Sequence, residues 1–251
     1  MPQRKGVTAA PPPAGHNCGN GFENEEGRQM ATHPAKYTDS FIPIFAKLLM
    51  DCKTVLDPFG GTGKLNKIKA FGFRGEIICN EIEPDFAKLE DKDCICFVDK
   101  WNIGDAEKMD FLNDESVDAI CTSPTYGNRM ADHFKTTSNR KYMTYTHCIG
   151  HDLNEGNTGK MQFGNAYMDK HMRIYRECNR VCKKGGKFIC NVSNFIRGGI
   201  EVDVVSFHKK ALENNGFCFV KTLSVPTRRM GFGQNREHRV QHEEIMVFEK
   251  L

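Results

Sequence analysis

The segment Asp57-Pro58-Phe59-Gly60-Gly61-Thr62-Gly63 combines residue types that suit ligand binding at the end of a strand. It follows the short apolar run 54–57 and precedes a helix-like stretch over 64–71. Glycines in such a turn let the backbone approach a ligand closely, and the first helical turn has free N–H groups. The spacing therefore predicts a ligand-binding loop.

Three kinds of ligand use glycine loops of this type. A phosphate-binding P-loop requires Gly-x-x-x-x-Gly-Lys-Ser/Thr, but Pro58 takes its first position and Leu65 follows Lys64. The dinucleotide spacing Gly-x-Gly-x-x-Gly does not occur here. An S-adenosylmethionine (SAM) loop remains, because the carboxylate of Asp57 suits a cationic sulfonium ligand.

Two further carboxylates follow strand-like runs. Glu81 lies 24 residues after Asp57, close to the offset of about 20 residues at which a carboxylate meets ribose hydroxyls in βαβ nucleotide sites. Asp105 ends a third run in Gly104-Asp105-Ala106. Because open α/β sheets bind ligands at the carboxyl ends of their strands, this order predicts a cofactor site. The simpler interpretation is a glycine-rich turn with two surface acids.

A proline-containing turn, Ser123-Pro124-Thr125-Tyr126-Gly127, directly follows the apolar run 117–122. Pro124 stiffens the turn. The Ser123 hydroxyl and the Tyr126 ring are expected to face the same crevice as the glycine loop.

With this turn the chain resembles the SAM-dependent amino-methyltransferases of DNA. Ser123-Pro124-Thr125-Tyr126 is similar to the serine form of their Asp/Asn/Ser-Pro-Pro-Tyr/Phe/Trp tetrad, and residues 57–63 are similar to their cofactor motif. His33-Pro34-Ala35-Lys36-Tyr37 resembles the segment that precedes that motif and closes over the methionine end. Together the motifs cover most of residues 31–195.

The resemblance implies two sets of site residues. The catalytic set is Ser123, Pro124 and Tyr126. The cofactor-binding set is His33, Lys36, Tyr37, Asp57, Pro58, Phe59, Gly60, Gly61, Gly63, Glu81, Ile82, Asp105 and Ala106.

The family's chemistry gives these residues a physical role. An exocyclic amine on a base is a weak nucleophile, because its lone pair is delocalised into the ring. If Ser123 and the carbonyl of Pro124 accept its hydrogens, the nitrogen becomes pyramidal and exposes the lone pair. Tyr126 would stack on the base, which has to leave the duplex. Holding the amine and the methyl group in line supplies up to about 7–11 kcal/mol in favourable systems.

The first tetrad residue bears on the choice of base. In the family, serine there leans towards cytosine N4, whereas aspartate or asparagine leans towards adenine N6. Methylation at carbon 5 of cytosine is disfavoured, because it needs a cysteine nucleophile after a proline and the chain has no Pro-Cys dipeptide.

Thr125 departs from the family pattern, which has a second proline there. The change removes rigidity and adds a backbone N–H. One alternative is therefore that the protein is an inactive homologue that binds SAM and DNA. A second is that the acceptor is an RNA base or a protein amide, because relatives with related tetrads act on these. A dehydrogenase is the weakest alternative.

Two basic loops adjoin strands of the expected sheet, and a solvated charged surface is the simpler interpretation of each. Aromatic residues lie among the first set of charges, as in grooves that bind nucleic acid. The stretch 127–165 is too long for an ordinary connection and is interpreted as a small target-recognition insert. The residues expected to contact nucleic acid are Arg129, Arg140, Lys141, Arg228, Arg229 and Arg236.

The strand-like and helix-like runs alternate along the chain, which predicts an α/β fold with a mostly parallel sheet. Together with the resemblance, this gives a doubly wound, seven-stranded, Rossmann-like methyltransferase fold. The runs 217–223 and 245–248 have no helix between them, so the last strand is expected to be antiparallel. An amphipathic helix is expected along Met168, Met172, Tyr175, Cys178 and Cys182, and another over 202–215.

Composition sets the remaining expectations. The 251 residues, 39% hydrophobic and 27% charged, suit one globular domain over 31–251 after a flexible tail over 1–30. No apolar run is long enough for a membrane span, and no signal peptide is visible. We therefore expect a cytoplasmic protein, taken as a monomer or weak dimer. The resemblance to DNA amino-methyltransferases implies that it acts on double-stranded DNA, in a restriction–modification or phage setting.

The 11 cysteines do not form a pattern for disulfides or metal binding. Cys79, Cys121, Cys190 and Cys218 lie within apolar runs, where a cysteine acts as a small hydrophobic residue. His147 and His151 share a face if helical, but no second ligand pair accompanies them, so no metal is expected.

Overall fold

The computed structural model describes residues 22–23, 29–30, 38–88, 97–127, 145–227 and 238–251. The chain divides into two units, Met1–Thr32 and His33–Leu251. In the first unit, β1 (Phe22–Glu23) pairs antiparallel with β2 (Gln29–Met30). The rest of the tail expected over 1–30 lies outside the described residues.

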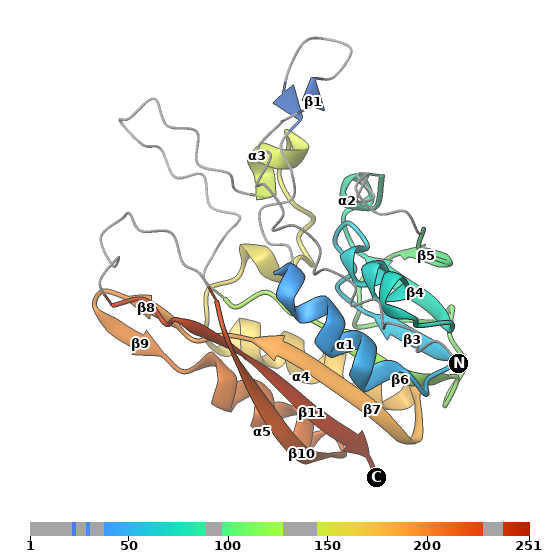
Figure 1. Cartoon of the computed structure of the whole chain (residues 1–251). Coiled ribbons are helices and arrows are strands. Elements are labelled where there is room, and N and C mark those ends of the chain that lie inside the picture. Colours follow the sequence, from blue (N-terminus) through green and yellow to red (C-terminus); the bar gives the residue numbers. More distant parts are fainter. Residues whose placement is uncertain (1–21, 24–28, 31–37, 89–96, 128–144, 228–237) are drawn as a thin grey trace, which may run out of the picture. The chain divides into compact units, whose positions relative to one another are not determined.

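The second unit contains a seven-stranded sheet of order β10-β11-β7-β6-β3-β4-β5 (Figure 1). Five neighbouring strands, from β7 to β5, run parallel, and β11 is antiparallel to both of its neighbours. The prediction of a mostly parallel sheet with an antiparallel last strand is therefore confirmed. The strands are β3 (Thr54–Asp57), β4 (Glu76–Glu81), β5 (Lys100–Ile103), β6 (Val117–Thr122), β7 (Cys182–Val192), β10 (Phe217–Pro226) and β11 (His242–Lys250).

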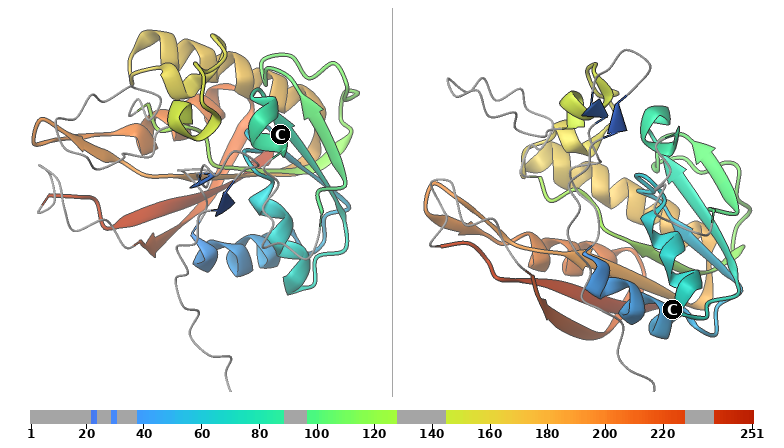
Figure 2. Two further views of the ribbon diagram at one scale, coloured as in Figure 1. Left: turned by 90° about the horizontal axis from the view of Figure 1, so that it is seen from above. Right: turned by 45° about the horizontal axis from the view of Figure 1, so that its top comes forward.

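Helices cover both faces of this sheet, which makes it doubly wound (Figure 2). Alternate strand residues face opposite sides, so Val55 and Ile77 pack with α1 and η2, whereas Leu56 and Ile78 belong to the core under α4 and α5. The helices are η1 (Asp39–Phe41), α1 (Ile42–Leu49), η2 (Lys64–Phe71), α2 (Pro84–Lys88), α3 (Tyr145–Ile149), η3 (Thr158–Lys160), α4 (Asn165–Val181) and α5 (Val204–Asn214). No helix of the described residues is long and apolar enough to cross a membrane.

The structure corrects several expected elements. The helix expected to reach Cys182 ends at Val181, and Cys182 begins β7. Its buried face includes Tyr167, His171 and Ile174, which the expected apolar face omitted. Cys218 is exposed although its run is apolar. The helix-like stretch expected over 64–71 is present with the same bounds, as a 3-10 helix. A small hairpin of β8 (Phe195–Arg197) and β9 (Ile200–Val202) was not predicted.

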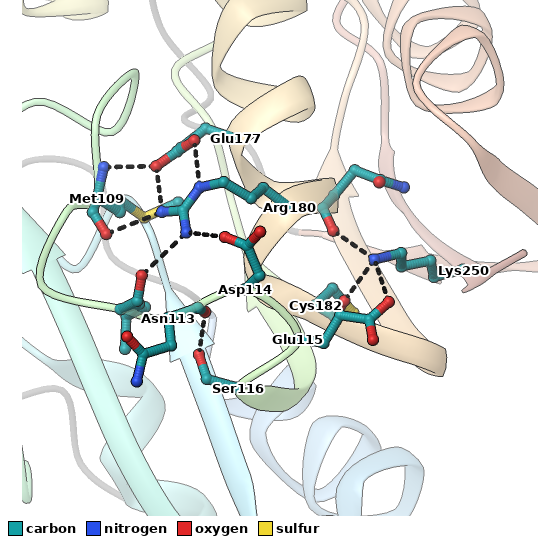
Figure 3. A network of polar contacts seen from close by, with 11 residues as sticks. Met109, Asn113, Asp114, Glu115, Ser116, Glu177, Arg180, Cys182 and Lys250 are labelled. Atoms are coloured by element: carbon teal, nitrogen blue, oxygen red, sulfur yellow. Dashed lines mark hydrogen bonds and ion pairs between the residues drawn. The ribbon is translucent and has the colours of Figure 1, made fainter.

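A polar network fixes the carboxyl end of α4 (Figure 3). The guanidinium of Arg180 donates to both carboxylate oxygens of Glu177, at 2.9 and 2.6 Å, and to Asp114 at 2.7 Å. The ammonium of Lys250 donates to the carbonyls of Asn179 and Cys182, both at 2.8 Å. The network lies where β6 begins. It therefore fixes the carboxyl end of α4 beside the amino end of this strand, whereas the predicted site lies at the carboxyl ends of the parallel strands.

Candidate active site

The glycine loop after β3 rests directly on β4 and β5. The Gly60 N–H donates to the carbonyl of Asn80 at 2.8 Å. A Cβ on Gly60 would lie 2.8 Å from that of Cys79 and 3.2 Å from the Trp101 ring. Gly63 has a φ of 72°, and a Cβ there would lie 2.6 Å from Val98. The loop therefore needs glycine at both positions, one for close packing and one also for its left-handed backbone.

Asp57 joins the glycine loop to the tetrad. This buried residue at the end of β3 accepts a hydrogen bond from the Phe59 N–H at 3.1 Å and one from the Thr122 hydroxyl at 2.6 Å. Thr122 is the last residue of β6 and directly precedes Ser123. The carboxyl ends of two adjacent parallel strands thus bring the two predicted motifs together.

Glu81, at the end of β4, holds the other side of the loop. One of its carboxylate oxygens accepts the Gly61 N–H at 2.7 Å, and the other accepts the Glu83 N–H at 2.9 Å. Burial raises the pKa of Glu81 to about 7. These bonds fix the Glu81 side chain against the glycine turn. Glu81 is the residue whose sequence spacing from Asp57 suggested a ribose contact.

Asp105 has a cationic partner that the sequence did not reveal. One carboxylate oxygen accepts from the ammonium of Lys170 on α4 at 2.6 Å, and the other accepts the Glu107 N–H at 3.0 Å. Lys170 is only 5% exposed. A Cβ on Gly156 would lie 2.6 Å from Asp105 and 3.0 Å from Ile82, so the end of the predicted insert packs against this corner of the site.

Glu83 fixes the same part of the insert. Its buried carboxylate accepts from the Asn154 N–H at 2.7 Å and from the Asn157 amide at 2.9 Å. Asn157 in turn accepts the Gly159 N–H at 2.8 Å and so caps η3. The second half of the insert is therefore bound to the connection between β4 and α2.

The tetrad lies in a cluster with two residues that sequence reasoning missed. The Tyr126 hydroxyl lies 3.2 Å from the Ser123 hydroxyl and donates to the Glu243 carboxylate at 3.1 Å. The Asn191 amide also donates to Glu243, at 2.9 Å. Asn191 lies on β7 and Glu243 on β11, so only the sheet order brings them to the tetrad.

Thr125, the departure from the family tetrad, is held by two hydrogen bonds. Its hydroxyl donates to the Thr158 hydroxyl at 2.7 Å, and its carbonyl accepts from the Tyr167 hydroxyl. Tyr167 lies 2.8 Å from one ring nitrogen of His208, and Tyr175 lies 2.6 Å from the other. This arrangement restrains the turn where a second proline would have stiffened it.

The predicted site residues thus fall into two groups. The predicted residues between Asp57 and Ala106 and the tetrad all lie at the carboxyl ends of the parallel strands β3, β4, β5 and β6. Those outside the described residues are His33, Lys36 and Tyr37, and the basic residues Arg129, Arg140, Lys141, Arg228, Arg229 and Arg236. Within the part of the chain that the structure describes, no group of three His, Cys, Asp or Glu side chains is arranged to hold a metal ion.

The side chains at these strand ends are of types that suit SAM. Carboxylates at the ends of β3 and β4, and after β5, offer acceptors for hydroxyl and amine groups and a negative charge for a sulfonium. The turn between them consists of glycines that admit a close ligand.

A family model for N6/N4 methylases, described as DNA methylase, matches residues 117–251. This span is more than half of the chain and contains the tetrad, Asn191 and Glu243. No curated protein matches the chain.

Solved structures resemble the chain at low sequence identity. A SAM-dependent methyltransferase from Methanosarcina mazei has a TM-score of 0.53 at 11% identity, over 83% of this chain and 97% of the other. A protein from Pyrococcus horikoshii OT3 has a TM-score of 0.52 at 15% identity, over 85% and 89%. The [4+2]-cyclase SpnF has a TM-score of 0.53 at 14% identity, over 88% and 85%. At identities this low, the structural likeness shows only a shared Rossmann-like methyltransferase fold. The cyclase is an example of this fold with a different reaction, so the fold alone does not determine the reaction.

Proposed function

The chain belongs to the N6/N4 DNA methylase family, and we propose that it transfers the methyl group of SAM to an exocyclic amine of a flipped DNA base, cytosine N4 in preference to adenine N6. One observation carries the proposal. The hydrogen bond of 2.6 Å between Thr122 and Asp57 joins the tetrad to the glycine loop at adjacent strand ends. This bond supports the proposal, because it makes the turn proposed to bind the amine a neighbour of the loop proposed to bind the cofactor.

SAM bound at this edge would supply an electrophilic methyl group on a sulfonium sulfur; breaking the C–S bond leaves a neutral thioether, and the methylated nitrogen, now acidic, releases one proton without a strong general base. Glu81 is proposed to bind its ribose hydroxyls, and Asp57 to favour its positive charge. The backbone of Gly60, Gly61 and Gly63, with Pro58 and Phe59, would form the floor under it. Ile82, Asp105 and Ala106 would border the remaining side, and His33, Lys36 and Tyr37 would close over the methionine end.

The tetrad would prepare the acceptor. The oxygen of Ser123 and the carbonyl of Pro124 would accept the hydrogens of the amine, which makes the nitrogen pyramidal and exposes its lone pair. Tyr126 would stack on the flipped base. The hydrogen bonds that hold Thr125 support an active tetrad, because they restrain the turn that carries these groups.

Serine at position 123 supports cytosine N4 over adenine N6, following the family tendency. The proposal also takes double-stranded DNA as acceptor and the working protein as a cytoplasmic monomer or weak dimer. Arg129, Arg140, Lys141, Arg228, Arg229 and Arg236 would contact the phosphates.

The direct test is transfer of labelled methyl from SAM to mixed-sequence duplex DNA, followed by nucleoside analysis of the product. We expect N4-methylcytosine. N6-methyladenine would keep the reaction but reverse the choice of base. Measurable SAM binding without transfer to DNA would contradict the proposal and favour an RNA or protein-amide acceptor, or an inactive homologue.

Variants separate the roles of the two motifs. Ser123→Ala and Tyr126→Ala should lower turnover about 10- to 100-fold, because each removes a contact to the acceptor base. SAM affinity should change less than about threefold in both, since neither side chain holds the cofactor. Asp57→Ala and Glu81→Ala should instead weaken SAM binding.

SAM affinity can be read from the fluorescence of Trp101, the single tryptophan, which packs against the glycine loop. An equal loss of SAM affinity in all four variants would contradict this division of roles.

A further inference from the structure

Four polar side chains, two half-buried in the turn after β6 and two buried on the neighbouring strands β7 and β11, form one cluster beside the proposed amine site. Ser123 and Tyr126 follow β6, Asn191 lies on β7 and Glu243 lies on β11. Asn191 is 1% exposed and Glu243 is 7% exposed. Polar groups at this depth persist when they are hydrogen-bonded, and the Asn191 and Glu243 side chains bond to each other at 2.9 Å.

Glu243 sets the direction of the bonds in the cluster. A carboxylate accepts hydrogen bonds, and one oxygen of Glu243 takes both the Tyr126 hydroxyl at 3.1 Å and the Asn191 amide at 2.9 Å. The opposite amide orientation would place two acceptors against each other, so the amide nitrogen faces Glu243.

The hydrogen bond from Tyr126 to Glu243 also determines which hydroxyl donates in the contact between Tyr126 and Ser123. Tyr126 has one hydroxyl hydrogen, which it gives to Glu243, so its oxygen can only accept at the contact of 3.2 Å with Ser123. Ser123 is then the donor in that contact, and its oxygen keeps lone pairs for another partner. The Asn191 amide lies 3.5 Å from the Ser123 oxygen, at the limit of hydrogen bonding, and competes only weakly for them.

We propose that Glu243, held by Asn191, is a positioning residue that makes Ser123 a hydrogen-bond acceptor towards the exocyclic amine. A serine hydroxyl on its own rotates freely and donates as readily as it accepts. With Glu243 at the end of the chain of hydroxyls, the amine always meets a lone pair. This inference rests on the proposed function and adds two residues to its machinery.

The experiment compares Glu243→Met, Glu243→Gln, Tyr126→Phe and the double variant Glu243→Met/Tyr126→Phe on the same mixed-sequence duplex. Methionine fills a similar volume without an acceptor oxygen, whereas glutamine keeps one. Glu244→Met is the matched control, because Glu244 neighbours Glu243 on β11 but contacts Ser224 on β10 at 3.0 Å. Turnover, KM for DNA, SAM affinity and the melting temperature are measured for each.

We expect Glu243→Met to lower kcat at least about tenfold, the effect of one lost hydrogen bond at the reacting group. KM for DNA and SAM affinity should stay within about twofold, and Glu243→Gln should recover most of the loss. Tyr126→Phe should resemble Glu243→Met, and the double variant should be no worse than either single variant, because all three break the same chain of bonds. Glu244→Met should keep the wild-type kcat.

Multiplying effects in the double variant, or a wild-type kcat in Glu243→Met, would overturn the inference. So would equal damage in Glu243→Gln and Glu243→Met. If Glu243→Met does not fold, an undiminished kcat in Tyr126→Phe has the same meaning. If the wild-type protein itself transfers no methyl to DNA, the proposed function fails and the inference falls with it.

Discussion

Glu81 and Asp57 occupy corresponding positions at the ends of β4 and β3, but their surroundings differ. Asp57 accepts the Thr122 hydroxyl and a backbone N–H. Glu81 accepts two backbone N–H groups, yet burial dominates and raises its pKa to about 7. Glu81 therefore changes charge near neutral pH.

This shift predicts a pH dependence of SAM binding. Ribose hydroxyls donate better to a carboxylate than to a neutral carboxyl group, so SAM affinity should rise as the pH increases through about 7. Below that pH the affinity should fall by up to about tenfold for each pH unit. Titrations followed by Trp101 fluorescence between about pH 5.5 and 8.5 measure it, and Glu81→Gln should remove the dependence. A constant affinity in the wild-type protein would exclude Glu81 from ribose binding.

The site residues that could be predicted from the sequence belong to contiguous motifs. Asp57 to Gly63 and Ser123 to Tyr126 carry several informative residue types in a row, so their spacing was enough. Asn191, Glu243 and Lys170 are single polar residues on separate elements, and their neighbours in sequence give no sign of a site. Only the sheet order and the burial of α4 bring them to the tetrad and to Asp105.

Among the elements, α4 and α5 hold the tetrad from behind through His208. One tautomer satisfies all three contacts: Tyr175 donates to Nδ1, Nε2–H donates to Tyr167, and Tyr167 donates to the carbonyl of Thr125. This arrangement requires a neutral His208, and burial lowers its pKa well below the ordinary value. The buried His171 on α4 behaves in the same way, with its pKa lowered to about 4.

Two neutral buried histidines predict a loss of stability in acid. Below about pH 6.5 the unfolded chain takes up protons that the native state refuses, so the free energy of unfolding falls as the pH falls. Each histidine contributes up to about 1.4 kcal/mol per pH unit. Glu81 acts in the opposite direction between its ordinary pKa and about 7, because the native state keeps its proton longer there.

Comparison with a variant isolates the histidine effect from that of Glu81. Urea unfolding between about pH 4.5 and 8 should give His208→Gln a smaller slope of stability against pH than the wild-type protein, by up to about 1.4 kcal/mol per pH unit. Equal slopes would show that His208 takes up a proton as readily in the native state as in the unfolded chain, which contradicts the hydrogen-bond arrangement behind Thr125.

The elements themselves followed the sequence closely where apolar runs were short and bounded by turn residues, as at 54–57 and 117–122. The errors arose where two patterns met. The apolar period of α4 continues into Cys182, but this residue pairs with Val117 and starts β7. The hairpin of β8 and β9 has three residues in each strand, too few for a periodic signal.

For the whole molecule, the net charge of +3 is small, so binding to DNA depends on where the charges lie. Along or beside the strand ends of the proposed site lie the acids Asp57, Glu81, Glu83, Asp105 and Glu243. Basic side chains there include Lys170, which pairs with Asp105, and Arg197, which donates to the Gly127 carbonyl. A cationic cofactor suits such an edge, but a DNA backbone does not. A DNA acceptor therefore needs further basic residues, and the sequence has them around positions 129–141 and 228–239.

This requirement predicts the salt dependence of DNA binding. If Arg228 and Arg229 each neutralise a phosphate, the variant Arg228→Ala/Arg229→Ala should reduce the slope of log K against log salt by about 1.8, or 0.9 for each contact. Its SAM affinity should not change. The control variant Lys100→Ala/Lys184→Ala removes the same charge at the amino ends of β5 and β7, away from the site, and should keep the wild-type slope. Equal slopes in the two variants would mean that DNA responds only to the total charge of the protein. A reduced slope in the arginine variant alone would assign this loop to the path of the DNA backbone.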